Sequence, residues 1–220
     1  MKAFQTEHIT CPKCGKEQEV KIYPSINASY DTEAKEKLMH NQLFSFTCEE
    51  CGETTPLLFN CLYHDMENGL MVWLMPEASD KELQEMNKTV TQMQAFGMTA
   101  TGLDYRYRIV RTVNELKEKL LIEQENLDDR IIELVKVVYL VQIAEQIGSH
   151  TVAEVMFDVI DDSYFFTVFY EEEALDPGVI PLDMNVYRMV KEQYAEKLGM
   201  HPKAGFQDIS FSWAREFMFA

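Results

Sequence analysis

Short runs of alternating apolar and polar residues mark the first third of the 220-residue chain. Glu19 to Ile26 alternates in this way, and Leu43 to Thr47 is a second strand-like run. Between them, residues 30–42 begin with an Asp-Thr pair suited to cap a helix and continue through helix-forming residues. The pattern therefore predicts a helix inserted between two strands.

Two further strand-like runs, Leu57 to His64 and Leu70 to Met75, flank a short polar segment. That segment ends in Asn68-Gly69, a dipeptide that readily takes the positive φ of a tight hairpin turn. The sequence thus predicts a β-hairpin at this point.

Apolar residues at helical spacing dominate the middle of the chain. Residues 79–93 are typical of a polar surface helix, and residues 97–102 are expected to form a loop. Two more helices are predicted over residues 112–125 and 128–147, the second capped at Asp128 and followed by a glycine stop.

Alternation returns after residue 148. Val155 to Ile160 and Tyr164 to Tyr170 predict a second hairpin around an Asp-Asp-Ser turn. A helix is predicted over residues 184–198, ending at Gly199, and residues 206–219 are expected to form a last strand. The tail therefore reads as a small β-β-α-β module.

Composition narrows the role of the cysteines. Hydrophobic residues make up 46% of the chain, enough to fill a core without covalent cross-links. The five cysteines are an odd number, and the N-terminus lacks the basic and apolar segments of a secretory signal. We therefore expect a cytoplasmic protein, in which paired thiols bind metal or do redox chemistry more often than they form structural disulfides.

The charge is strongly acidic, with a formal net value of −17. Such a chain repels phosphate backbones unless it has a local basic face. The nearest candidate comprises Arg106, Arg108 and Arg111, which we interpret as a strand face contacting the chain's own carboxylates. The longest apolar run, residues 134–144, is well short of the roughly 20 residues of a membrane span. We therefore expect neither nucleic acid nor membrane among the partners.

Four of the five cysteines form two matching motifs, CPKCG at residues 11–15 and CEECG at residues 48–52. Zinc binds four thiolates tetrahedrally, and the two-residue spacing lets both sulfurs of one motif reach the same ion. A glycine follows the second cysteine of each motif and permits the positive φ of a tight turn. Each Cys-x-x-Cys-Gly motif is here called a knuckle. The paired knuckles predict a zinc ribbon with four ligands: Cys11, Cys14, Cys48 and Cys51.

Other chemistries share parts of this pattern. Iron in a rubredoxin-like site uses the same four-thiolate geometry. Thiol-disulfide enzymes place their first cysteine at a helix N-terminus, where the pKa of the thiol falls, whereas residues 11–15 precede a predicted strand. Disulfides are a further, less favoured alternative. Because four protein ligands leave no position for water, we interpret the site as structural. The 33 residues between Cys14 and Cys48 must fold up between the knuckles.

Few other residues are candidates for chemistry. Cys61 lies in an apolar strand and is expected to pack as a small hydrophobe. His8 is interpreted as a surface residue because its spacing from Cys11 is poor for a ligand. Asp65 beside His64 could make the histidine a general base, but neighbouring residues on a strand point to opposite faces. Asp65 is therefore expected to cap the turn. Phosphate-binding loops, nucleophile elbows and zinc-protease motifs are absent from the sequence.

Five separated segments together resemble the CpXC family of bacterial proteins. They are CPKCG, SINA at residues 25–28, FTCEECG at residues 46–52, YHD at residues 63–65 with the strand LMVWLMPE, and LDDRIIEL at residues 127–134. The resemblance runs from about Ile9 to Lys136. It implies a domain that binds zinc through its four cysteines, and it implies no particular reaction. Glu49 stands where the family often has proline, which leaves all four sulfurs in place.

The sequence as a whole predicts an α+β fold in three ranges: a β-rich zinc-ribbon region at 1–78 with an inserted helix, a helical part at 79–148, and a C-terminal module at 149–220. We expect a non-enzymatic zinc protein that presents an interaction surface to another protein. One alternative is an enzyme with a site near His64 and Asp65. A second alternative is a redox protein that uses the Cys-x-x-Cys knuckles.

Overall fold

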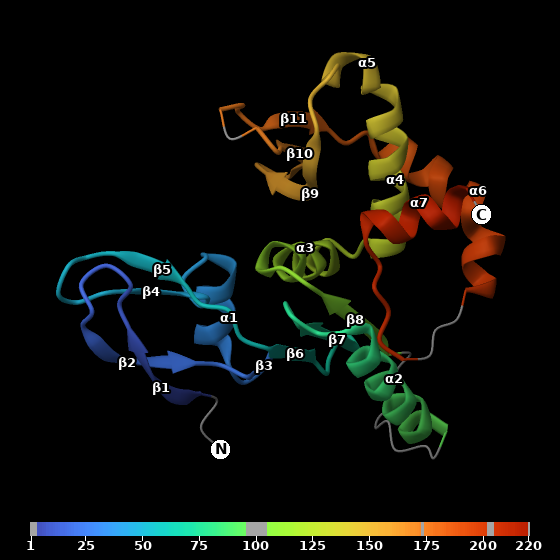
Figure 1. Ribbon diagram of the computed structural model, residues 1–220. Coiled ribbons are helices and arrows are strands. Elements are labelled where there is room, and N and C mark those ends of the chain that lie inside the picture. Colours follow the sequence, from blue (N-terminus) through green and yellow to red (C-terminus); the bar gives the residue numbers. More distant parts are fainter. Residues whose placement is uncertain (1–3, 96–104, 173, 202–204, 220) are drawn as a thin grey trace. The chain divides into compact units, whose positions relative to one another are not determined.

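The computed structural model describes residues 4–95, 105–172, 174–201 and 205–219 (Figure 1). The chain divides into two compact units. Unit 1 comprises Met1–Lys117 with Ala204–Gln207, and unit 2 comprises Glu118–Lys203 with Asp208–Ala220. The boundary falls within helix α3 (Val113–Gln124). The division expected from the sequence, into residues 1–78, 79–148 and 149–220, stays a prediction.

Two small hairpins carry the knuckles of unit 1. Strands β1 (Gln5–Thr10) and β2 (Glu17–Ile22) pair antiparallel around the first knuckle. Strands β4 (Ser45–Thr47) and β5 (Thr54–Pro56) do the same around the second. The predicted inserted helix is α1 (Thr32–Met39).

A mixed four-stranded sheet forms the other part of unit 1, in the order β3-β6-β7-β8. Strand β3 (Ser25–Asn27) is separate from β2 although the sequence predicts one continuous strand, because Pro24 between them has no N–H to donate. Strands β6 (Cys61–Asp65) and β7 (Leu70–Leu74) form the predicted hairpin. Strands β3 and β8 (Arg106–Val110) pair parallel with β6 and β7, respectively.

Helix α2 (Asp80–Ala95) confirms the surface helix predicted over residues 79–93. Its apolar side chains Leu83, Met86 and Val90 pack on a cluster that contains Tyr107 and Ile109 of β8. The loop predicted at residues 97–102 lies outside the described residues.

Unit 2 packs helices on one face of a three-stranded antiparallel sheet, in the order β11-β10-β9 (Figure 1). Strands β9 (Val152–Ile160) and β10 (Ser163–Tyr170) form the second predicted hairpin. The helix predicted over 128–147 is interrupted at Ile143, which separates α4 (Asp129–Gln142) from α5 (Ala144–Ile147). Asp128 caps α4 as expected, its side chain accepting a bond from the Arg130 N–H.

The C-terminal prediction needs three corrections. Strand β11 (Gly178–Pro181) was missed. Helix α6 (Met184–Met200) continues through Gly199, where a stop was expected. The last strand predicted over residues 206–219 is wrong, since Phe211–Phe219 forms helix α7. Ala214 of α7 is fully buried, and Trp213 and Phe217 pack on the same core, so tertiary burial outweighs the local strand-like alternation.

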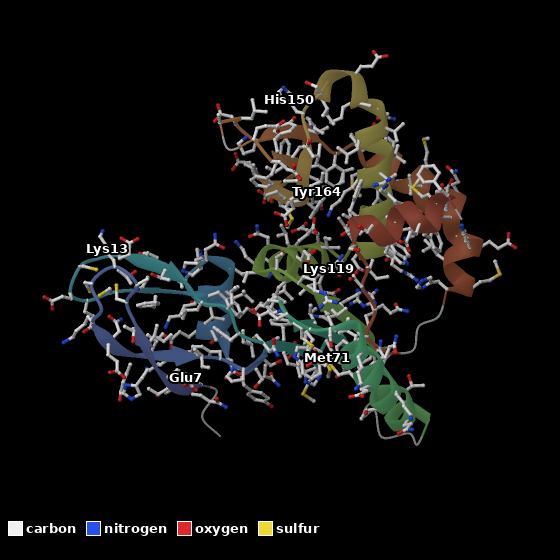
Figure 2. The ribbon with its side chains drawn as sticks, in the orientation of Figure 1. Glu7, Lys13, Met71, Lys119, His150 and Tyr164 are labelled. Carbon is white, nitrogen blue, oxygen red and sulfur yellow. The ribbon has the colours of Figure 1, made fainter. Side chains whose placement is uncertain are left out.

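An ion cluster is buried within unit 2. Lys119, labelled in Figure 2, places its Nζ 2.9 Å from Glu133 Oε1 and 3.5 Å from Asp129 Oδ2. The Nζ of Lys136 lies 2.6 Å from Glu118 Oε1 and 3.1 Å from Glu133 Oε2. All five side chains are at most 9% exposed.

The ion cluster also binds the main chain. Lys119 donates to the carbonyl of Ile209, and Glu118 accepts from the N–H of Phe157. The cluster thereby joins α3, α4, β9 and the segment before α7.

The architecture is α+β, as predicted. Among the helices of the described residues, none is both long enough and apolar enough to cross a bilayer.

Candidate metal centre

The two knuckles are copies of one loop. In the first, the Cys11 N–H donates to the Lys16 carbonyl at 2.9 Å and the Gly15 N–H donates to the Cys11 carbonyl at 3.0 Å. The second has the equivalent bonds, from Cys48 to Glu53 at 2.8 Å and from Gly52 to Cys48 at 2.9 Å. Each loop begins where one strand of a hairpin ends and finishes just before the next strand. The same local structure thus presents two cysteines twice.

Both knuckle glycines adopt the conformation expected from the sequence. Gly15 has a φ of 73° and Gly52 a φ of 70°. Residues with a side chain rarely occupy this region because their Cβ approaches the backbone. Within the described part of the chain, no heavy atom beyond the chain neighbours would lie within 4 Å of a Cβ added at either position. The need for glycine therefore arises from the backbone conformation alone.

The four knuckle cysteines converge on one point. Their sulfurs all lie within 4.8 Å of one another, and the closest pairs across the knuckles are Cys11–Cys51 at 3.7 Å and Cys14–Cys48 at 3.6 Å. Four sulfurs placed tetrahedrally around a zinc ion would lie about 3.8 Å apart. A disulfide would bring two sulfurs to about 2.05 Å. The arrangement is therefore compatible with a structural metal site, and all five cysteines are free thiols.

The family comparison covers this region. The CpXC family model, described as "CpXC protein", matches residues 9–136, more than half of the chain. The chain belongs to the CpXC family. The CpXC match includes both knuckles and the β6–β7 hairpin, whereas the sheet of unit 2 and the helices after it lie beyond residue 136. Comparison with curated proteins gave no match, and comparison with solved structures gave none.

Hydrogen bonds favour the thiolate form at Cys11 of the CpXC knuckles. The main-chain N–H of Cys14 donates to the Cys11 sulfur, and together with the N–H of Lys13 it lowers the pKa of this thiol to about 7 despite burial. Cys11 and Cys48 are buried, Cys51 is half-buried and Cys14 is exposed. Although a main-chain hydrogen bond at Lys16 lowers it, desolvation and the neighbouring thiols raise the pKa of Cys14 to about 12, and the pKa of Cys51 is raised as well. Because zinc and iron bind cysteine as the thiolate, Cys14 and Cys51 must lose their protons when a metal binds.

Polar contacts join the two CpXC knuckles beyond the sulfurs. Lys13, labelled in Figure 2, pairs with Glu53 at 2.8 Å. Gln18 donates to the Thr47 carbonyl at 3.3 Å and accepts from the Glu49 N–H at 3.1 Å. Sequence reasoning missed Gln18 because a polar residue on an alternating strand carries no distinguishing signal. Its side chain holds the second knuckle beside β2.

Apolar packing also supports the CpXC knuckles. Phe46 and Leu57 are buried in one cluster with Cys11 and Cys48. The site therefore has its own small core.

His64 and Asp65 make different hydrogen bonds. The carboxylate of Asp65 accepts bonds from the N–H groups of Glu67 and Asn68 and from the Asn68 amide, so it caps the turn as expected. His64 is half-buried, and its Nε2 lies 3.0 Å from the Tyr105 hydroxyl. Burial lowers the pKa of His64, which favours the neutral imidazole. The two neighbours thus serve different contacts.

The remaining candidates lie apart from the cysteine cluster or are inert. His8 is exposed and pairs with Glu17 and Glu19 of the adjacent strand at 3.5 and 3.7 Å. Cys61 is fully buried, and burial raises the pKa of its thiol to about 12. Both agree with the roles expected from the sequence.

The arginine stripe on β8 and beyond it binds carbonyl oxygens. Arg106 donates to the carbonyl of Asn68, Arg108 to that of Tyr107, and Arg111 to that of Ala78. Arg108 is buried. These contacts engage the stripe within its own unit.

Proposed function

We propose that this CpXC protein binds one zinc ion through Cys11, Cys14, Cys48 and Cys51. The ion is structural and stabilises a non-enzymatic module that binds another protein. The observation that carries the proposal is the convergence of four sulfurs from two matching knuckles, with separations close to those of a zinc tetrathiolate.

A structural role follows from the number of ligands. Catalytic zinc keeps one coordination position for water or substrate, whereas four thiolates occupy all four positions. Metal binding supplies roughly 10–16 kcal/mol in zinc-finger peptides, which is ample to offset closure of the chain between the knuckles. Zinc is favoured over iron because the role requires no redox change.

Two observations weigh against the alternative functions. Each knuckle runs into a strand, β2 or β5, so neither has the helix N-terminus that lowers the thiol pKa in redox enzymes. Asp65 is engaged in capping its hairpin turn, which leaves an enzyme near His64 without its second group. Free thiols in all five positions suit a reducing compartment such as the cytoplasm.

Electrostatics favour a protein partner over nucleic acid. The formal charge of the chain is −17, and four thiolates with one Zn²⁺ make it more negative. The second knuckle carries Glu49, Glu50 and Glu53, which repel phosphate. A protein partner with basic groups fits this charge.

The test combines metal analysis with unfolding. Purified protein should contain one zinc per chain, and X-ray absorption should give four sulfur neighbours at about 2.3 Å. Cys48→Ser should lose the metal and unfold unit 1. Cys61→Ala is the matched control, since it removes a buried thiol outside the cluster and should retain the zinc. A metal-free protein with an unchanged melting curve would overturn the proposal, and bound iron would overturn the choice of metal.

A further inference from the structure

The sheet of unit 2 has two faces of different character. One face packs on the helices through buried side chains: Val155, Phe157, Phe166 and Val168. Partly buried residues on the same face of the sheet, including Tyr164 and Ile180, also pack against that core. Tyr164 is labelled in Figure 2. The helices therefore cover the inner face of the sheet.

The outer face carries a second set of apolar residues. Met156 and Val179 both lie opposite Thr167 in the register, and Phe165 and Phe169 flank Thr167 on β10. Val179 is 56% exposed, and the other three apolar side chains are partly exposed. Because these residues lie on three adjacent strands, they form one patch, here called the aromatic patch.

Acidic residues border the aromatic patch along β9 and at the β9–β10 turn. Glu154 lies opposite Phe169 and Asp158 opposite Phe165, both on the outer face. The adjoining β9–β10 turn contains Asp161 and Asp162. No Lys or Arg occurs anywhere in residues 137–187, the stretch that includes the whole sheet. Glu154 has a further contact within the chain, so Asp158, Asp161 and Asp162 supply the negative charge at the border of the patch, here called the acidic rim.

We propose that this face binds a basic amphipathic helix of a partner protein. The apolar side of such a helix would cover the aromatic patch, and its Lys and Arg side chains would reach the acidic rim. This inference rests on the proposed function as an interaction module and names the surface and the partner. A second copy of the chain is a poor occupant because the same acidic rims would face each other.

The edge of the sheet is less suited to binding than its face. Along β9, the N–H of Phe157 donates to the Glu118 carboxylate and the N–H of Val159 donates to Asp158. Strand β11 has four residues and ends in Pro181, which cannot donate. A partner strand would therefore find few free donors, and docking on the face is favoured over strand addition.

The experiment uses the zinc-loaded 220-residue chain and a fluorescein-labelled amphipathic helical peptide of Leu, Ala and Lys. A matched peptide with Glu in place of Lys tests charge, and a scrambled peptide of the same composition tests amphipathicity. Fluorescence anisotropy should show binding of the first peptide alone, weakening as salt rises. Equal binding of all three peptides, or no binding of the first, would overturn the proposal.

Two variants of the outer face test whether the peptide binds there. Phe165→Ala with Phe169→Ala should weaken binding at least about tenfold, as expected for aromatic anchors. Asp158→Lys should also weaken binding. The charge control makes the same change on the exposed face of α6, with Glu192→Lys. Equal loss in the control would show attraction by net charge alone and overturn the assignment.

Two further readouts separate the outcomes. Light scattering should give the same mass for the wild type and the double alanine variant, and a dimer abolished by those alanines would assign the face to a second copy instead. Zinc is measured on the same samples. A zinc-loaded chain that does not bind the peptide contradicts this inference alone, whereas a chain without zinc contradicts the proposed function.

Discussion

Removing one ammonium group from the buried ion cluster should destabilise unit 2 strongly. Lys136 lies between the carboxylates of Glu118 and Glu133, and all three side chains are at most 3% exposed. The variant Lys136→Met has a similar length but leaves both carboxylates without this partner. Breaking a buried pair from one side costs about 3–5 kcal/mol because the remaining charge stays desolvated. We expect a loss of stability of that size.

A second substitution should recover part of the loss. Glu118→Gln added to Lys136→Met removes the stranded negative charge and keeps an acceptor for the N–H of Phe157. Lys119 then remains with Glu133 and Asp129, as in the wild type. The double variant should be more stable than Lys136→Met alone, and measuring Glu118→Gln alone as well completes the cycle that gives the coupling between the two sites.

The loss should also depend on pH. Burial raises the pKa of Glu118 above its usual range in the wild type. Without Lys136 that pKa should rise further, because an attractive positive charge is gone. A carboxyl with a raised folded pKa costs stability above that pKa, and the cost falls as pH falls through it. The destabilisation by Lys136→Met should therefore be smaller at about pH 6 than at about pH 8.

Urea unfolding followed by circular dichroism gives the free energies, and hydrogen exchange shows whether the change lies in unit 2. The exposed Lys191 on α6 is the control, and Lys191→Met should change stability by less than about 0.5 kcal/mol. A Lys136→Met variant within about 1 kcal/mol of the wild type would refute the reasoning. So would a double variant less stable than the single one.

Four other outcomes follow from single features of unit 1. Gly52→Ala should cost about 1 kcal/mol through its positive φ, seen as a several-fold loss in zinc affinity in a chelator competition, whereas an unchanged affinity would contradict the backbone argument. Asp65→Ala removes the acceptor of three turn hydrogen bonds and should lower the free energy of unfolding by about 1–3 kcal/mol, measured by denaturant titration. In the zinc-loaded chain under native conditions, iodoacetamide should leave Cys61 unmodified because its thiol is fully buried, whereas chelation should expose it by unfolding unit 1, and mass spectrometry showing Cys61 modified in the zinc-loaded chain would contradict its burial. No binding to DNA or RNA is expected at physiological salt in an electrophoretic shift assay, and a micromolar affinity abolished by Arg106→Ala with Arg108→Ala would prove this wrong.

Sequence alone predicted those features that have a local cause. The knuckles are short motifs with fixed spacing, and the β6–β7 and β9–β10 hairpins follow from turn residues between alternating runs. Asp128 and Asp65 were recognised because capping involves residues only two or three positions away. Each half of the cysteine cluster is predictable for the same reason, because the two-residue spacing within a knuckle brings its two sulfurs close together.

Features that depend on distant contacts were missed. Helix α7 alternates like a strand at its start, and only its burial against the core of unit 2 shows that Ala214 and Phe217 belong to a helix. Strand β11 is too short to give a pattern. Lys119 and Lys136 look like ordinary surface residues in the sequence, because the carboxylates that allow their burial are brought near by folding.

The parallel pairing of β3 with β6 bears on the order in which unit 1 folds. These strands are separated in the chain by residues 28–60, which contain α1 and the whole second knuckle. Pairing across such a gap is slow because the intervening chain must first be closed. With zinc bound, the knuckles are already joined, β3 follows one closely and β6 follows the other, so the search is shorter. Metal supply during synthesis would then decide how long the apolar strands β6 and β7 remain open to aggregation.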